Sequence, residues 1–393
     1  MSKIVFFGIP AHGHTNPTLG VVSELVSRGH QVWYYSYNMM REKIESSGAT
    51  FVSCDEYDAE IKTNTKTSEK VGKDLAYSTK LLVDTTLAID DKLCAEMLKL
   101  KPDCIVADSM ALWGKAIAMK LDIPFVSSTT TFAFNQYSAK VMKQSAVDLL
   151  RMLISLPAVS KQVKRLKDKG YPVNNILDII GSDNDAHTIV FTSPDFQPFS
   201  ETFSDKYAFV GPSVRTATDI IEKTSEKLIY ISMGTVNNKM LSLYKKCIKS
   251  FEKSDYQVII SVGNSISIEE FGKLPGNISI YPQVDQIAVL EKADAFISHC
   301  GMNSVSESLY YGVPLIMVPQ TSEQKGVAER VFELGAGIKL EKINVNSIYG
   351  SVIKIFEDDT YKNNATEISR DFKKCLGAVG AADKILKVCN KIN

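Results

Sequence analysis

The sequence predicts an α/β protein made of two doubly wound units, and three observations support this class. Ile4 to Ile9 is a continuous apolar run, as expected of a parallel strand that is covered on both faces. A turn, a helix and a second strand follow it, which is a βαβ unit. The pattern of strand, glycine turn and helix begins again at Lys227, after a polar stretch at 211–223 that we interpret as the linker.

The chain before the linker alternates apolar strands with helices. Asn16-Pro17 has the cap residue and the first-turn proline of a helix start, and Gly29 ends that helix. The polar stretch 55–80 is interpreted as loop and surface helix. The expected strands are 4–9, 31–35, 104–107, 125–128 and 189–192, and the expected later helices are 81–100, 111–121 and 137–166.

The chain after the linker repeats this alternation. The expected strands are 227–232, 257–262, 295–298 and 315–318. His299 to Asn303 is a tight polar turn after the third of these strands, and Ser304 is expected to open the next helix. Polar groups therefore follow the carboxyl ends of the strands, where open α/β sheets bind ligands.

The turn after residue 298 predicts an anion site. Free backbone N–H groups in a turn and at a helix N-terminus favour an anion, most naturally phosphate, and His299 and Ser304 add side-chain donors. Ser232 and Gly234-Thr235 form a second strand-end turn, which would face the same ligand if the two strands are neighbours. An ordinary turn between a strand and a helix remains an alternative for this second turn.

Glu307 has two interpretations. Ser304-Val305-Ser306-Glu307 has the spacing of a capping box, in which serine and glutamate satisfy the helix start, and from the sequence alone this interpretation is the stronger one. A carboxylate at a helix start beside a phosphate site can also reach a ribose.

His14 and Asp108 each follow a strand of the N-terminal sheet, so both face the same rim. A histidine beside a carboxylate is the usual arrangement for a general base whose imidazolium is stabilised. In the alternative, His14 only shapes its turn and Asp108 caps its helix. His12 lies two residues from His14 and could exchange roles with it.

Composition excludes several classes. Lys+Arg and Asp+Glu are both 45, so the net charge of zero argues against a protein built to bind nucleic acid, although a local patch remains possible. Seven scattered cysteines without a CxxC pair fit buried thiols in a reducing compartment. The N-terminal apolar run is too short for a signal peptide, and no run approaches the ~18 residues of a membrane span. We therefore expect a cytoplasmic protein.

Several motifs of other enzyme classes are missing. The first turn is P-A-H-G-H instead of G-x-G-x-x-G, and no acidic residue closes the second strand, which counts against an NAD enzyme. No phosphate-binding P-loop and no zinc-spaced His/Cys cluster occurs. Asp183-Asn184-Asp185 superficially matches the D-x-D signature of metal-dependent sugar transfer, but its neighbours indicate a surface turn.

Three stretches carry a resemblance to a known family. Pro10 to Pro17 resembles the N-terminal G-H-x-N-P element of the UDP-dependent glycosyltransferases of the GT1 family, and Pro102 to Asp108 resembles that family's second element. The long stretch from Ile297 to Gln324 is similar to its C-terminal signature. The overall pattern is closest to bacterial enzymes that glucosylate macrolides and flavonoids. The resemblance implies the GT-B fold, in which two Rossmann-like domains face each other across a cleft.

The resemblance also implies roles for individual residues. His14 would deprotonate an acceptor hydroxyl while Asp108 orients it, and the oxygen would attack a nucleotide sugar with inversion. No metal would be needed, because fixed donors hold the charge of the departing UDP. The implied donor-binding residues are Ser232, Gly234, Thr235, His299, Gly301, Asn303 and Ser304 for the diphosphate, Glu307 for ribose, and Glu323 and Gln324 for the sugar.

One element departs from the family pattern. The family's W-x-P-Q element falls on Gln283-Val284-Asp285-Gln286, so Gln283 occupies the position of the aromatic residue that stacks on uracil. Tyr281 lies two residues earlier. Gln286 would keep a backbone or ribose role in this implied donor site. The departure leaves the base preference of the protein open.

Taken together, the sequence predicts an acceptor-binding domain at 1–212, a nucleotide-sugar-binding domain at 213–370 and a C-terminal helix at 371–393 that returns to the first domain. The expected function is transfer of a hexose, most naturally from UDP-glucose, to a small lipophilic hydroxyl compound bound near Phe132 and Phe134. The alternatives are transfer to a lipid-linked carrier in envelope synthesis and nucleotide-sugar binding without turnover. Transfer to the carrier would need an exposed apolar and basic patch on the N-terminal domain, which the balanced charge of the chain does not reveal.

Overall fold

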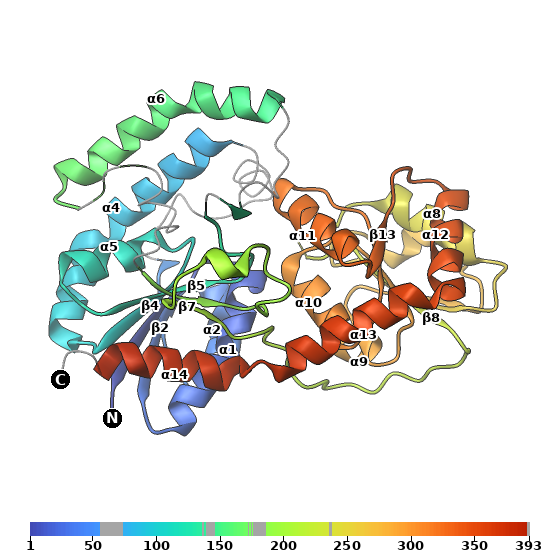
Figure 1. The fold of residues 1–393 in the computed structure, drawn as a ribbon, viewed down its shortest axis with the longest axis horizontal. Coiled ribbons are helices and arrows are strands. Elements are labelled where there is room, and N and C mark those ends of the chain that lie inside the picture. Colours follow the sequence, from blue (N-terminus) through green and yellow to red (C-terminus); the bar gives the residue numbers. More distant parts are fainter. Residues whose placement is uncertain are drawn as a thin grey trace. The chain divides into compact units, whose positions relative to one another are not determined.

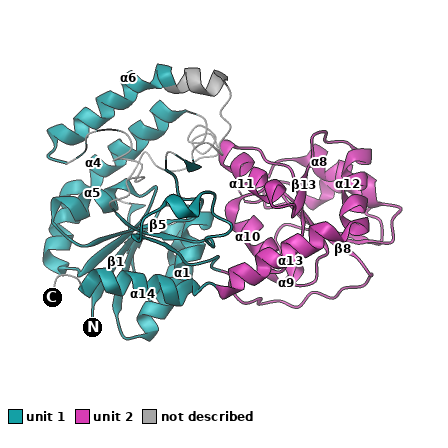
Figure 2. Cartoon of the chain, viewed as in Figure 1, with its two compact units in different colours: residues 1–213, 375–393 teal, residues 214–374 magenta. Residues whose placement is uncertain are grey.

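The computed structural model describes residues 1–55, 74–135, 137–138, 146–171, 173, 175, 186–235 and 238–390, and for 146–152 it describes the backbone alone. The chain divides into two compact units, each with its own sheet (Figure 2). Unit 1 comprises 1–213 and 375–393, and unit 2 comprises 214–374. The Asp183–Asp185 turn lies outside the described residues.

Unit 1 contains a seven-stranded parallel sheet of order β3-β2-β1-β4-β5-β6-β7 (Figure 1). The strands are β1 Lys3–Phe7, β2 Gln31–Ser36, β3 Thr50–Ser53, β4 Cys104–Asp108, β5 Phe125–Thr129, β6 His187–Val190 and β7 Tyr207–Phe209. The strand order reverses between β1 and β4, which pair in parallel with Phe7 opposite Ala107. Such a reversal is the point at which doubly wound sheets bind ligands.

Helices complete unit 1. They are α1 His12–Ser27, α2 Arg41–Ser46, α4 Leu75–Leu100, α5 Leu112–Lys120, α6 Ala146–Asp168 and α14 Gly377–Cys389, with short 3₁₀ helices η1 Asn38–Met40 and η4 Ser200–Thr202. Helix α6 packs on α4, and α4 packs on α5. Helices α5, α4 and α6 therefore pack on one another in succession.

The C-terminal helix α14 belongs to unit 1, although the residues before it belong to unit 2. It packs along α1. Ala381, Ala382 and Ile385 are fully buried in the core that also contains Ile4 and Phe6. The unit boundaries at 213/214 and 374/375 lie close to the expected ones at 212 and 370.

Unit 2 contains a six-stranded parallel sheet of order β10-β9-β8-β11-β12-β13. The strands are β8 Leu228–Ser232, β9 Gln257–Ser261, β10 Ile278–Tyr281, β11 Ala295–Ser298, β12 Leu315–Met317 and β13 Gly337–Lys339. The order reverses between β8 and β11, and the last residues of these strands, Ser232 and Ser298, lie opposite each other. Both units are thus Rossmann-like.

The helices of unit 2 follow its strands. They are α8 Leu241–Phe251, α9 Gln286–Leu290, α10 Met302–Tyr310, α11 Ser322–Glu333, α12 Val345–Glu357 and α13 Asp359–Lys374, with the 3₁₀ helix η5 Ile268–Phe271. The core of this unit forms between the sheet, α8 and α12, where Tyr244, Phe251 and Ile348 are fully buried.

Two predicted helix starts are wrong. Helix α1 begins at His12, before the predicted Asn16, because the Ala11 carbonyl already accepts the N–H groups of His14 and Thr15. Helix α10 begins at Met302, before the predicted Ser304. In both helices the N-cap residue has extended backbone and no side-chain cap, so no capping residue marks the start in the sequence.

Among the described residues, no helix is both long enough and apolar enough to span a bilayer.

Candidate active site

His14 and Asp108 form a hydrogen-bonded pair at the strand reversal of unit 1. His14 lies in the first turn of α1, directly after β1, and Asp108 is the last residue of the neighbouring strand β4. The distance between Nδ1 of His14 and Oδ2 of Asp108 is 2.8 Å. The side chain of Asp108 is 3% exposed and that of His14 is 28% exposed, so the carboxylate lies behind an accessible imidazole.

Asp108 is itself held in place. Its Oδ1 accepts the N–H of Met110 at 2.8 Å, and its main-chain carbonyl accepts the N–H of Ala111. Helix α5 has Ala111 at its N-cap, so Asp108 is not the capping residue of that helix. Thr130 adds a hydroxyl 3.3 Å from Nδ1 of His14. The pair therefore has a fixed geometry, with the carboxylate hydrogen-bonded to one ring nitrogen of the imidazole.

His12 does not replace His14 in this pair. It is the first residue of α1, and burial together with the charge of Lys43 lowers its pKa below the usual value for histidine. Because the carboxylate of Asp108 contacts His14, the structure favours His14 for the role that the sequence left open between them.

His299 follows β11 at the strand reversal of unit 2, where its ring lies against two glycines. A Cβ atom at Gly234 would be 2.6 Å from Nε2 of the imidazole, and one at Gly301 would also be 2.6 Å from it. Burial lowers the pKa of His299 to about 4, and the Ser232 carbonyl only partly opposes this shift. The imidazole is therefore neutral at physiological pH and is fixed by close packing.

The turn after His299 has a strained backbone. Cys300 has φ of +67°, in the left-handed region that favours glycine, and its N–H donates to Ser298 Oγ at 3.1 Å. Gly301 is the N-cap of α10, with no side chain to satisfy the first N–H groups of that helix. The arrangement exposes backbone donors at the positive end of a helix, which suits an anion.

Glu307 is bound to Gln286 and does not form the predicted capping box. Gln286 Nε2 donates to Glu307 Oε2 at 2.5 Å and to Ser304 Oγ at 3.4 Å, while Tyr230 donates its hydroxyl to Gln286 Oε1 at 3.2 Å. The capping-box interpretation is wrong because α10 begins before Ser304. Tyr230 is fully buried, and its ring stacks on Phe296.

The electrostatics of this network depend on burial. Burial raises the pKa of Glu307, and the contact with Gln286 and the charge of Arg215 oppose the shift. Arg215 pairs with Asp285, whose pKa is lowered by Arg215 and by hydrogen bonds from Thr218. Asp285 is also the N-cap of α9, so it fixes the helix that begins with Gln286.

The remaining predicted donor residues lie at the same ends of the strands of unit 2. Ser232 is buried and accepts the N–H of Gly234 at 3.4 Å, and Thr235 is exposed. Asn303 is in the first turn of α10. Glu323 is in the first turn of α11, and Gln324 forms a capping box there with Thr321.

The element that departs from the family pattern lies beyond edge strand β10. Gln283 is exposed and Val284 is half-buried, while Tyr281, the last residue of β10, is 44% exposed. Both a glutamine and a tyrosine are therefore accessible at this end of the sheet.

The predicted acceptor residues occupy different environments. Phe132 is buried, and its ring packs on Phe196 with centroids 5.7 Å apart, while Phe134 is half-buried. Phe132 thus supports the wall of unit 1 after β5, and Phe134 is the more accessible of the two.

Sequence reasoning missed Tyr230 and Arg215 near the site, and it placed Thr130 on the ligand side of the sheet without assigning it a role. Tyr230 was interpreted only as part of an apolar strand, although a buried tyrosine needs a partner for its hydroxyl, and this need was the available signal. Arg215 lies in the linker and had no pattern to single it out. Among the described residues, no group of three His, Cys, Asp or Glu side chains could hold a metal ion.

Comparison with known proteins identifies the class. The structure matches the glycosyltransferase of kitacinnamycin with a TM-score of 0.86, 24% identity and coverage of 98% of each chain. Residues 245–374 match the family model of the erythromycin biosynthesis protein CIII-like C-terminal domain. Two parallel α/β units of this kind define the GT-B fold.

Relatives in sequence identify the family. An NDP-glycosyltransferase of Bacillus subtilis (strain 168) is 34% identical, over 97% of this chain and 96% of its own. A protein of the same strain that is named an uncharacterized UDP-glucosyltransferase is 31% identical, over 98% of this chain and 97% of its own. The chain belongs to the GT1 family of bacterial glycosyltransferases. It is therefore an enzyme that transfers a sugar.

The packing of His299 generates a first prediction. Gly301→Ala places a methyl carbon 2.6 Å from Nε2 of His299, which is closer than van der Waals contact allows. We therefore expect the free energy of unfolding to fall by about 1–3 kcal/mol, as at other overpacked sites. Gly276→Ala is the control, because a Cβ there meets no atom within 4 Å, and its effect should stay within about 0.5 kcal/mol. The measurement is urea unfolding. Equal stability of the two variants would contradict the packing.

The neutral state of His299 generates a second prediction. The imidazole titrates at about 4 in the folded protein and near 6.5 in the unfolded chain, so the unfolded chain binds more protons between these values. Stability should therefore fall as the pH falls from 6.5 to 4, by up to about 3 kcal/mol from this group. Urea unfolding at several pH values checks it.

The control for this pH dependence is His299→Gln, which removes the titrating group. Glu307 has a raised pKa, so its contribution to the free energy of unfolding rises as the pH falls, opposite to that of His299. Because wild type and variant share Glu307, the difference between their unfolding free energies reports His299. If the unfolding free energies of wild type and variant differ by the same amount at every pH, His299 has the same pKa in the folded protein and in the unfolded chain, which contradicts the prediction.

Proposed function

We propose that this glycosyltransferase transfers glucose from UDP-glucose to a hydroxyl group of a small lipophilic acceptor, with inversion and without a metal. The observation that carries the proposal is the 2.8 Å hydrogen bond between His14 and Asp108, with the imidazole partly exposed. A base of this kind has no use in a protein that only binds nucleotide sugars.

The reaction is a single displacement. With Nδ1–H of His14 donating to Asp108, the lone pair on Nε2 takes the proton of the acceptor hydroxyl. The acceptor oxygen forms a bond to the anomeric carbon as the bond to the UDP oxygen breaks, and UDP leaves with that electron pair. Attack opposite the leaving group inverts the anomeric carbon. Asp108 stabilises the imidazolium that results.

Unit 2 supplies the donor site in this proposal. The backbone from Gly301 to Ser304 and the N-terminus of α10 hold the diphosphate, with the neutral imidazole of His299 and the hydroxyls of Ser232 and Thr235. Fixed donors then take the place of a cation. The carboxylate of Glu307 accepts ribose hydroxyls. Glu323 and Gln324 contact the sugar.

The names of more distant relatives support a lipophilic acceptor. A relative from Streptomyces antibioticus is named oleandomycin glycosyltransferase, and one from Pantoea ananas is named zeaxanthin glucosyltransferase. We propose a phenol, macrolide or similar compound as the acceptor here, bound after β5 near Phe134.

Turnover with and without the base is the test of this function. Wild-type protein, UDP-glucose and a panel of phenols and macrolides are incubated with EDTA, and the anomeric configuration of the product is read by NMR. His14→Ala and Asp108→Asn should lower kcat by about 10²–10⁴-fold, because the base or its orientation is lost. UDP affinity, measured by calorimetry, should stay unchanged.

Three outcomes would contradict the proposal. UDP affinity without turnover on any acceptor would indicate a binding protein. Turnover that EDTA abolishes would show that a metal takes part. Retention of the anomeric configuration would require two displacements and a covalent intermediate instead of one displacement by the acceptor.

Tyr230 provides a separate prediction on the donor side. Its hydroxyl fixes the orientation of the Gln286 amide, which in turn directs its NH₂ group at Glu307. Tyr230→Phe keeps the ring stack on Phe296 and removes this hydrogen bond, so the KM for the donor should rise about tenfold, the equivalent of one hydrogen bond. The KM for the acceptor is the control and should not change.

A further inference from the structure

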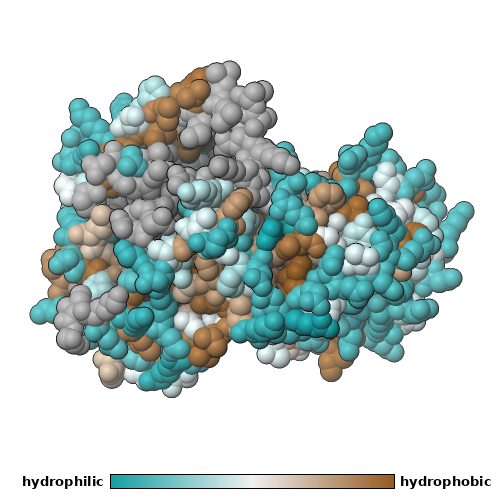
Figure 3. Space-filling model, viewed as in Figure 1, coloured by the Kyte–Doolittle hydropathy of each residue, from teal (hydrophilic) through white to brown (hydrophobic). Residues whose placement is uncertain are grey.

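The outer face of α6 in unit 1 presents large apolar side chains to solvent. Leu153 is 61% exposed, Ile154 is 71% exposed and Leu156 is 39% exposed, all within one turn of the helix. The space-filling view shows apolar surface over this part of α6 (Figure 3). Exposed apolar side chains gathered in this way mark an interaction surface more often than isolated ones do.

The fold of unit 1 does not need these side chains. The inner face of α6 packs through Val163 and Leu166 against Val83 of α4 and Leu112 of α5. The inner face therefore anchors the helix, and the exposed leucines and isoleucine contribute little to the core. Their hydrophobic free energy remains available for a partner.

Basic side chains continue the same outer face. Lys161 and Lys164 are exposed and follow Ile154 and Leu153 by seven and eleven residues, spacings that place them on one side of an α-helix. Lys167 and Lys169 are also exposed. In the sequence from 153 to 170 the only acidic residue is Asp168. The face is thus apolar toward its N-terminal end and basic toward its C-terminal end.

We propose that this outer face of α6 docks on an anionic phospholipid bilayer. Apolar side chains inserted at the headgroup boundary, together with lysines on anionic headgroups, give the two signals that reversible membrane attachment needs. A second copy of the chain would fit less well, because it would bring a second set of lysines without matching acidic side chains on this face. Docking does not depend on the proposed reaction, although it would bring the enzyme to acceptors that dissolve in the membrane.

Sedimentation with vesicles tests the docking without any turnover. The full-length protein should sediment with vesicles of equal parts phosphatidylcholine and phosphatidylglycerol, but not with vesicles of phosphatidylcholine alone, and high salt should release it. Lys161→Gln with Lys164→Gln should weaken partitioning about thirtyfold, at about fivefold per lysine. Leu153→Ser with Ile154→Ser should weaken it about tenfold or more.

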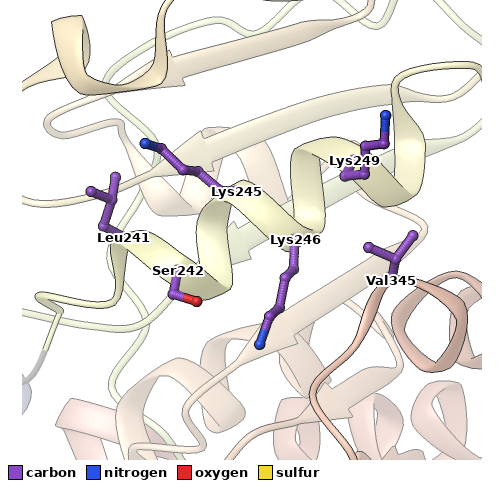
Figure 4. Close-up of a pocket in the computed structure, with 6 residues that line it drawn as sticks. All are labelled: Leu241, Ser242, Lys245, Lys246, Lys249 and Val345. Carbon is purple, nitrogen blue, oxygen red and sulfur yellow. The ribbon is translucent and has the colours of Figure 1, made fainter.

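Matched control variants distinguish the effect of the α6 face from the effect of removing the same charge or apolar area anywhere on the protein. Lys245 and Lys249 line a hollow of about 570 Å³ beside α8 in unit 2, and Lys245→Gln with Lys249→Gln removes the same charge elsewhere (Figure 4). Leu98→Ser with Ile220→Ser removes two other exposed apolar side chains. Both control pairs should bind vesicles like wild type, and circular dichroism should show that every variant is folded.

Three results would overturn the proposal. If the protein binds neutral and anionic vesicles equally, anionic headgroups are not recognised. If the control pairs weaken vesicle binding as much as the α6 variants do, the outer face of α6 is not the docking surface. A concentration-dependent dimer in sedimentation velocity that the α6 variants dissociate, without vesicle binding by wild type, would assign the face to a second copy of the chain. The transferase assay is independent of either result.

Discussion

The parallel pairing of the two central strands in each unit is the constraint on which the cluster of polar residues in each unit depends. Strands β1 and β4 run side by side, and the chain leaves them in opposite directions across the sheet. Side chains that follow the two strands therefore meet, as His14 and Asp108 do. In unit 2 the same pairing of β8 and β11 brings Ser232 opposite Ser298 and places His299 against Gly234. Each unit thus builds its chemistry at one reversal of strand order.

The two imidazoles at these reversals have opposite environments. A carboxylate lies 2.8 Å from His14, so a proton taken by that ring is stabilised. His299 packs on two glycines, and burial holds its pKa near 4, so it stays neutral. A neutral ring donates one N–H without adding a charge that must be neutralised again when a product leaves. Sequence position alone cannot distinguish these environments, because both histidines simply follow an apolar strand.

Much of the architecture could be predicted because its signals are local. Continuous apolar runs marked the strands, and the polar stretch at 211–223 marked the linker. The predicted helix starts were wrong where the N-cap residue is Ala11 or Gly301, because neither has a side chain that could mark a cap. The bond between Gln286 and Glu307 joins side chains from two helices, so only the packing of α9 beside α10 reveals it. The role of Arg215 could not be predicted for the same reason, because its partner Asp285 lies 70 residues later in the sequence.

Zero net charge says little about whether a protein meets a membrane. The 45 basic and 45 acidic residues cancel over the whole chain, but salt screens charges beyond about 8–10 Å, so a surface responds to its nearest charges alone. Among the side chains described on α6, the exposed lysines at 161, 164 and 167 are accompanied by a single exposed acid, Asp168. An anionic bilayer touching that helix would therefore meet a basic face with an apolar end. The chain's overall balance follows from acidic residues elsewhere, such as Asp84 of α4, which pairs with Arg165 and not with the exposed lysines of this face.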